Sequence, residues 1–135
     1  MAFEIRKRER EGVVLLDLEG RLIVGDPAGQ LREEILKLSS AGQNRIILNL
    51  QKVDFIDSTG LGAMVICFTT IKKAGGALKL LNLAERGIEL LVLTKLTSVF
   101  EMFDDEQHAV NSFFPGREIQ RFDILSFVQK QQRED

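Results

Sequence analysis

Hydrophobic and polar positions along this chain switch between the period of about two residues that strands show and the longer period of helices. Residues 45–50 (Arg-Ile-Ile-Leu-Asn-Leu) form a short apolar run with polar ends, which is typical of a strand covered on both faces. After Ser58 the apolar residues recur at helical spacing. We therefore expect a central strand that ends near Leu50, and a helix from about Ser58 to Ala74 that buries Leu61, Met64, Val65, Phe68 and Ile71.

The same reading predicts the other elements. Residues 3–10 and 13–19 are expected to be strands, and the Glu11-Gly12 turn between them favours an antiparallel hairpin. Alternating strands and helices with short connections indicate an α/β fold, a single mixed and mostly parallel sheet with an antiparallel N-terminal hairpin, covered by amphipathic helices. The remaining expected elements are a helix after Asp26 that buries Leu31, Ile35 and Leu38, a strand at 77–81, a helix at 84–93 that buries Ile88, Leu91 and Val92, a strand at 99–103 and a helix from Asp104 through Phe113.

Two residues are expected to cap helices. Ser58 precedes an apolar helical pattern, so its hydroxyl should accept from an N–H of the first turn and its side chain should lie at the surface. Asp26 precedes Pro27, a residue that favours the first helical position. After Ser58, Gly60 and Gly62 each cost roughly 1 kcal/mol of helix propensity. Either this bare turn packs closely on a neighbouring segment, or another molecule approaches its backbone around Ser58.

Composition narrows the class of protein. With 135 residues, 44% of them hydrophobic and 28% charged, the chain is expected to be one globular domain with a true core. A net charge of -2 gives no strong overall field that would steer polyanions to the protein, so no direct nucleic-acid partner is expected. The amino terminus carries charges where a signal peptide needs apolar residues, and no apolar run is long enough to span a bilayer. We therefore expect a cytoplasmic protein without a membrane partner.

Catalytic and metal chemistry lack the residues they need. His108 is the single histidine and lies far from Ser58 along the chain, which disfavours a Ser/His/Asp site. Asp54 and Asp57 have no third oxygen-rich segment to complete a Mg²⁺ site. The single cysteine, Cys67, lies among apolar residues and is expected to be a small buried hydrophobe. We expect no catalytic residues, no enzyme activity, no cofactor and no metal.

One segment resembles a known family. Asp57-Ser58-Thr59-Gly60-Leu61-Gly62, preceded by the Ile-Ile-Leu-Asn-Leu strand and followed by an amphipathic helix, is similar to the phosphorylation-site motif of the STAS-domain proteins, the bacterial SpoIIAA-like anti-sigma factor antagonists. The resemblance covers about residues 3–114. It extends to Gly75-Gly76 before a strand and to Asn82-Leu83 leading into a helix.

The resemblance implies a function. An anti-sigma factor antagonist has no catalytic activity of its own; unphosphorylated, it binds an anti-sigma factor that is also a serine kinase and so releases the sigma factor. Phosphorylation of the serine after the aspartate, here Ser58, stops this binding, and a PP2C-type phosphatase resets the switch. The alternative is a ligand-sensing or scaffold STAS module in which Ser58 is only a cap. The partner-binding residues that the resemblance implies are Asp26, Asp57, Ser58, Thr59, Gly60, Leu61 and Gly62.

The chain departs from the family pattern in two places. Several members carry an acidic residue directly after the leucine that ends the second strand, whereas here Ile23 follows Leu22 and Asp26 is the nearest acid. The second departure is residues 115–135, which follow the STAS domain expected at residues 1–114. This extension is too apolar to be a purely solvating tail. It is expected to pack on its own domain, in a dimer or on a partner, and the sequence leaves the oligomeric state open.

Overall fold

The computed structural model of the protein describes residues 3–134, and within them the strands form one five-stranded sheet in the order β1-β2-β3-β4-β5. β1 pairs antiparallel with β2, and each later pair is parallel. The mixed, mostly parallel sheet with an N-terminal hairpin is therefore confirmed, and β3 is the central strand as expected. The strands are β1 Glu4–Arg10, β2 Val13–Leu22, β3 Arg45–Ile56, β4 Ala77–Leu81 and β5 Met102–Phe103.

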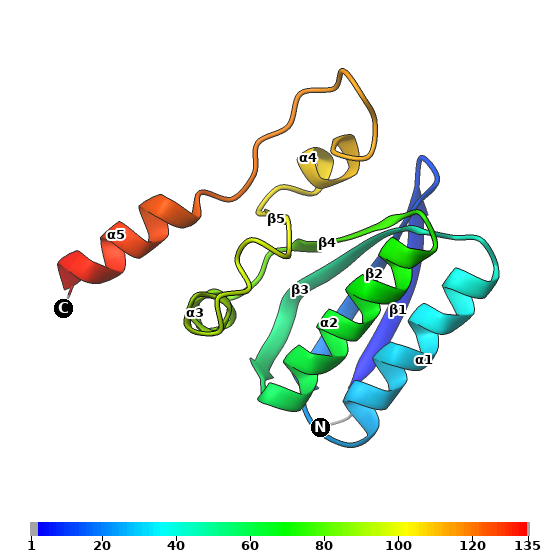
Figure 1. Cartoon of the computed structure of the whole chain (residues 1–135), viewed down its shortest axis with the longest axis horizontal. Coiled ribbons are helices and arrows are strands. Elements are labelled where there is room, and N and C mark those ends of the chain that lie inside the picture. The colour runs from blue at the N-terminus through cyan, green and yellow to red at the C-terminus, as the bar shows by residue number, and fades with distance from the viewer. Residues whose placement is uncertain (1–2, 135) are drawn as a thin grey trace.

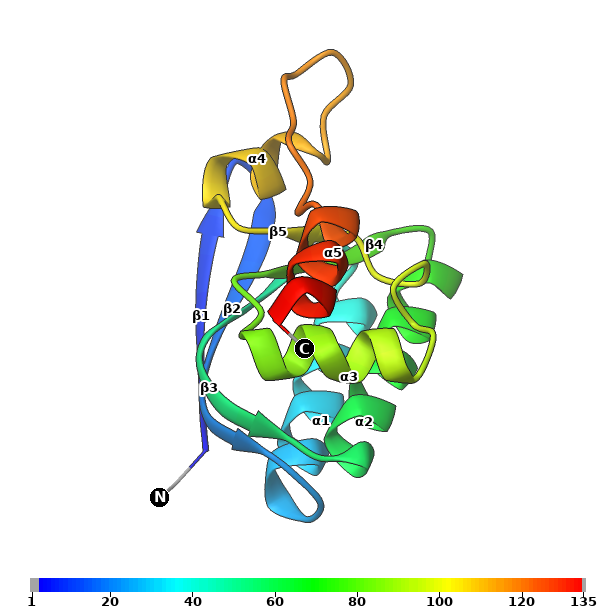
Figure 2. The ribbon, with the colours of Figure 1, turned by 90° about the vertical axis from the view of Figure 1, so that its left-hand side faces the viewer.

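The helices cover the sheet unequally. α1 (Asp26–Ser40) and α2 (Ser58–Lys73) lie side by side on one face, and both begin at the end of the sheet where β3 ends (Figure 1). α4 (Glu106–Asn111) packs near the opposite end, on the other side of the sheet (Figure 2). α3 (Glu85–Leu93) lies between β4 and β5 along the chain, and α5 (Ile124–Glu134) follows α4. The ends of β2 and β3 therefore meet the starts of α1 and α2 at one end of the sheet, which we call the junction.

The main core lies between the sheet and the pair α1 and α2. The predicted α1 stripe of Leu31, Ile35 and Leu38 is fully buried, as are Leu61, Met64 and Ile71 of α2. The expected burial of Val65 and Phe68 is wrong in degree, because both side chains are only half-buried at the margin of this core. The buried stripe of α2 is instead completed by Ala63 and Cys67, since α1 packs along that side of the helix.

A smaller core lies on the other face of the sheet. Buried side chains of β2, β3, β4 and β5 meet Ala109 and Val110 of α4 there. At its margin Arg8 of β1 donates from Nε to Asp17 at 2.7 Å and from its other nitrogens to Glu106 at 3.0 and 2.5 Å. This charge network fixes the start of α4 over the hairpin.

Several predicted boundaries shift. β3 continues six residues past Leu50 because residues 51–56 pair with the end of β2, although Gln51, Lys52 and Asp54 are exposed. The last strand spans only Met102–Phe103, and α4 ends at Asn111 rather than Phe113. In the helix at Glu85–Leu93, Ile88 and Leu91 are buried as expected, whereas Val92 is half-buried.

The segment after Pro115 returns to the domain. The amide of Phe122 donates to the carbonyl of Met102 at 2.8 Å, and Phe122 and Ile124 pack against the main core. Arg117 forms an ion pair with Glu11 at 2.9 Å. Beyond these contacts the side chain of Leu125 stays 67% exposed. The division into residues 1–114 and 115–135, and the role of the extension, stay predictions.

Candidate functional site

The junction before α2 is organised by Asp57. Its backbone is extended, its Oδ1 accepts from the amide of Gly60 at 2.7 Å, and its Oδ2 accepts from the amide of Val24 at 3.0 Å. Asp57 is therefore the N-cap of α2, and the prediction that Ser58 holds this position is wrong. A carboxylate has two oxygens to offer, so Asp57 caps the helix and ties down the loop before α1, which a single hydroxyl would not do. Ser58 becomes the first residue of the helix and is exposed.

The prediction that Asp26 caps α1 is also wrong. Gly25 is the N-cap of α1, with φ near +96°, and no side chain caps this helix. Asp26 is the first helical residue and Pro27 the second. The chain enters α1 one residue earlier because Gly25 accepts a left-handed conformation that would strain another residue. Asp26 is exposed and follows the loop that Asp57 holds, so the structure brings Asp26 and Ser58 to the same end of the sheet.

The two glycines of the motif have different roles. A Cβ on Gly60 would lie 2.0 Å from the carbonyl oxygen of Leu22, so this glycine is required by close packing on the end of β2. A Cβ on Gly62 would meet nothing within 4 Å. Close packing therefore explains Gly60, whereas no packing within the described residues explains Gly62.

The predicted partner-binding residues divide into exposed and buried groups. Ser58 and Thr59 are exposed, and Asp57 and Gly62 are half-buried. Gly60 and Leu61 are buried and contribute to the site by fixing the first turn of α2. The sequence reading missed Val24, whose apolar side chain is 63% exposed next to the Asp57 hydrogen bond. Val24 is an isolated valine in a glycine-rich loop, so the sequence pattern does not indicate that its side chain is exposed at the site.

The carboxylate of Asp57 places a negative charge at the start of α2. The amides of Gly60 and Val24 donate to Asp57 and hold the pKa of its carboxyl below the ordinary value, and the positive charge of Arg21 adds to this effect. Arg21 lies at the end of β2, and its guanidinium carbon is 5.3 Å from the ring centroid of Phe55. Asp57 is therefore ionised at neutral pH and the helix terminus already holds one anion.

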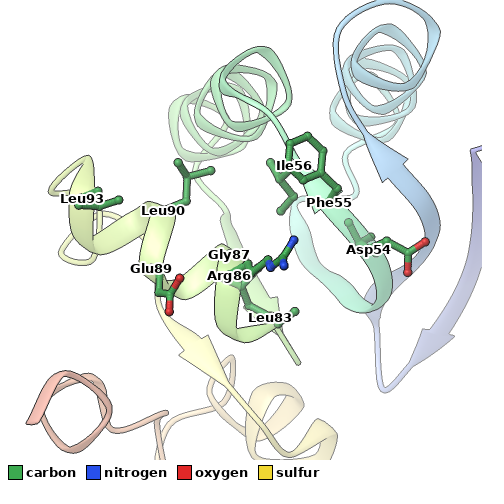
Figure 3. A pocket seen from close by; sticks show the side chains of 11 residues that line it. Asp54, Phe55, Ile56, Leu83, Arg86, Gly87, Glu89, Leu90 and Leu93 are labelled. Atoms are coloured by element: carbon green, nitrogen blue, oxygen red, sulfur yellow. The ribbon is translucent and has the colours of Figure 1, made fainter. Parts of the chain in front are cut away.

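A cavity of about 270 Å³ adjoins the site, between the end of β3 and α3 (Figure 3). Its walls include Phe55 and Ile56 from the strand that leads to Ser58, and Leu90 from α3. In Figure 3 the guanidinium of Arg86 points toward Phe55 and Ile56, while the carboxylate of Asp54 points away from α3. The cavity and the exposed first turn of α2 thus share one end of the sheet.

Reactive groups elsewhere do not add a second site. Cys67 is buried, as the sequence predicts, and burial raises the pKa of its thiol to about 12, so the thiol stays protonated. No group of three or more histidine, cysteine and acidic side chains with metal-binding geometry occurs among the residues that the structure describes. Within residues 3–134, no helix combines the length and apolar character needed to cross a bilayer.

Comparison with known proteins agrees with this fold. The STAS domain profile matches residues 4–109. The anti-sigma-B factor antagonist of Bacillus subtilis (strain 168) is 35% identical over 102 residues, which cover 76% of this chain and 92% of that protein. The chain therefore belongs to the STAS domain family, in which relatives act as anti-sigma factor antagonists.

Solved structures show the same architecture. A candidate anti-sigma factor antagonist from Thermotoga maritima superposes with a TM-score of 0.76 at 25% identity, covering 81% of this chain and 93% of that one. The Bacillus protein SpoIIAA in its phosphorylated form superposes with a TM-score of 0.64 at 22% identity, covering 82% of this chain and 98% of that one. The second likeness establishes the shared fold.

Proposed function

We propose that this protein is a cytoplasmic anti-sigma factor antagonist controlled by phosphorylation of Ser58. In its unphosphorylated form it binds an anti-sigma factor that is also a serine kinase, and the sigma factor is released. The kinase transfers the γ-phosphoryl group of ATP to Oγ of Ser58, ADP leaves, and the hydroxyl proton passes to a base of the kinase. A PP2C-type phosphatase removes the phosphate. The protein itself has no catalytic role.

The observation that carries this proposal is the exposed hydroxyl of Ser58 at a terminus that another residue caps. Because Asp57 accepts the Gly60 amide, Ser58 is not needed to hold the helix. Its hydroxyl is free to enter a kinase active site without loss of the cap. Thr59 is the nearest competing hydroxyl and is also exposed. The family resemblance of Asp57-Ser58-Thr59-Gly60-Leu61-Gly62 selects Ser58.

The effect of phosphorylation should lie in the interface. Phosphate adds about -1.5 to -2 charges at pH 7, and negative charge at a helix N-terminus is typically favourable by about 0.3 to 1 kcal/mol. The fold should therefore survive. A partner surface shaped for a hydroxyl and the bare backbone of Gly62 would instead have to desolvate a dianion beside Asp57. A thousandfold loss of affinity needs only about 4 kcal/mol, which an unpaired desolvated charge supplies.

The cavity beside Phe55 supports the alternative, a ligand-sensing STAS module. Its walls are largely apolar, and they include Ile56, the last residue of the strand that leads into α2. In that case a small molecule would bind between β3 and α3, and Ser58 would carry no phosphate.

Incubation of the purified protein with its cognate anti-sigma factor kinase and ATP, followed by phosphosite mapping, tests the proposal. We expect one phosphate on Ser58, none in Ser58→Ala, and normal labelling in Thr59→Ala. Ser126 provides a matched control, because it is another exposed serine near the start of a helix, so Ser126→Ala should label as the unchanged protein does. Label on Thr59 alone would assign the switch to that residue, and no label on either residue would favour the ligand-sensing module.

A further inference from the structure

The environment of Ser58 has to accommodate two negative groups once the serine is phosphorylated. Asp57 already uses Oδ1 for the Gly60 amide and Oδ2 for the Val24 amide. These two amides are therefore already occupied by the ionised carboxylate of Asp57, and a phosphate on the next residue would lie beside this carboxylate. Two neighbouring negative groups repel each other, so the charge state of the phosphate would depend on a nearby cation.

Arg21 is a cation on the end of β2 that contacts the first turn of α2. It lies one residue before Leu22, whose carbonyl oxygen accepts from the Asp57 amide at 3.2 Å and would touch any Cβ on Gly60. Its strand position pairs with Phe55, three residues before Ser58. The end of β2 that carries Arg21 is thus in contact with the first turn of α2.

Arg21 is also available for a new partner. Its side chain is exposed, and its guanidinium rests over the ring of Phe55, itself 41% exposed. Among the side chains that the structure describes, no carboxylate forms an ion pair with Arg21 within 4 Å. A planar guanidinium held over a ring keeps its edge free to donate two parallel hydrogen bonds to phosphate oxygens.

Other charged groups at this end of the molecule are less suited to the role. Asp26, Asp54 and Asp57 are acidic, and they would repel a phosphate. Arg86 projects from α3 toward Phe55 and Ile56 across the adjoining cavity (Figure 3). Arg32 lies farther along α1, beside the groove that Cys67 lines. Arg21 alone among these cations sits on the strand end that contacts the first turn of α2.

We propose that Arg21 is the residue that pairs with the phosphate on Ser58, with its guanidinium donating to the phosphate oxygens from the end of β2. This inference rests on the proposed phosphorylation of Ser58. The pair offsets the repulsion from Asp57 and holds the phosphate as a dianion at neutral pH. Arg21 is thus the residue that gives the phosphorylated site its charge state and orientation.

The test places phosphoserine at position 58 of the full chain by genetic incorporation, so that no kinase is needed. The second pKa of the phosphate, about 6 in free phosphoserine, is then measured by ³¹P NMR titration. We expect Arg21→Gln to raise this pKa by about 0.2 to 0.7, the range set by an exposed ion pair. Arg21→Lys should restore most of the difference, and 0.5 M NaCl should shrink it because salt screens exposed charges. Arg32→Gln and Arg86→Gln are the matched controls. In each of them the second pKa of the phosphate should equal that of the phosphorylated protein with all its arginines.

Three results would overturn the pairing: equal phosphate pKa values with and without Arg21→Gln, a shift in Arg86→Gln that Arg21→Gln lacks, or an Arg21→Gln shift that high salt leaves unchanged. Thermal unfolding of each phosphorylated variant checks that the fold is intact, and Arg21→Lys serves as the comparison if Arg21→Gln does not fold. Failure of a kinase to label Ser58 would defeat the proposed function and leave this titration unaffected. The two outcomes are therefore distinguishable.

Discussion

Gly60→Ala and Gly62→Ala form a pair of substitutions with opposite expected effects, although only Leu61 separates the two glycines in the same motif. The Cβ added at Gly60 would lie 2.0 Å from the carbonyl oxygen and 2.8 Å from the carbonyl carbon of Leu22. Both atoms belong to the backbone, so either β2 or the first turn of α2 must shift. The Cβ added at Gly62 has open space around it.

The magnitudes follow from two opposing terms. Overpacking typically costs about 1 to 3 kcal/mol, and replacing glycine by alanine in a helix returns up to roughly 1 kcal/mol. For Gly60→Ala the clash should dominate and lower the free energy of unfolding by about 2 kcal/mol. For Gly62→Ala only the helix term remains, so the free energy of unfolding should rise by about 0.5 to 1 kcal/mol.

Urea unfolding followed by circular dichroism measures both effects. With a urea m-value of about 2 kcal/mol/M, Gly60→Ala should lower the midpoint by roughly 1 M, and Gly62→Ala should raise it by a few tenths. An unchanged midpoint in Gly60→Ala, or equal losses in both variants, would refute the packing assigned to the first turn of α2.

Three further predictions concern other parts of the structure. Asp57→Ala should lower the free energy of unfolding by about 0.5 to 2 kcal/mol and speed hydrogen exchange at the amides of Gly60 and Val24; retained protection of both amides would contradict the double hydrogen bond. Hydrogen bonds from Arg8 lower the pKa of the Glu106 carboxyl to about 2, so the ionised carboxylate stabilises the fold at neutral pH, and this contribution is lost as pH falls from about 4.5 toward 2. Glu106→Gln should therefore cost about 1 to 2 kcal/mol at pH 7, allowing for solvent screening, and nothing near pH 2; a gap in stability that does not depend on pH would contradict this. Truncation after Pro115 removes Phe122 and Ile124 from the main core and should lower the melting temperature by several degrees; an unchanged value would show that the extension has no packing role.

Periodicity made most of the fold predictable. The α1 stripe, the β1–β2 hairpin and the five-residue strand Ala77–Leu81 follow directly from apolar spacing and turn residues. The extension of β3 to Ile56 was not predictable in this way. Lys52 and Asp54 face solvent where the sheet is uncovered, so their polarity hides a strand that hydrogen bonds to β2 define.

The site was predictable in composition and less so in geometry. Ser58 at the start of a helix follows from apolar spacing, whereas Asp26 entered the expected site only through the family resemblance. The choice between Asp57 and Ser58 as cap depends on Val24, whose amide is 33 residues away along the chain. The different roles of Gly60 and Gly62 depend on the position of the Leu22 carbonyl. Contacts of this kind arise from tertiary packing, which local spacing does not contain.

The central claim is that the charge on Ser58 decides whether the protein binds its anti-sigma factor. Calorimetric titration of the unphosphorylated protein and of the form with phosphoserine at position 58 against the cognate anti-sigma factor kinase tests it most directly. We predict tight binding of the unphosphorylated protein and of Ser58→Ala, and an affinity about a thousandfold weaker for the phosphorylated form, equivalent to about 4 kcal/mol. Equal affinities for the two forms, with both folded, would contradict the account.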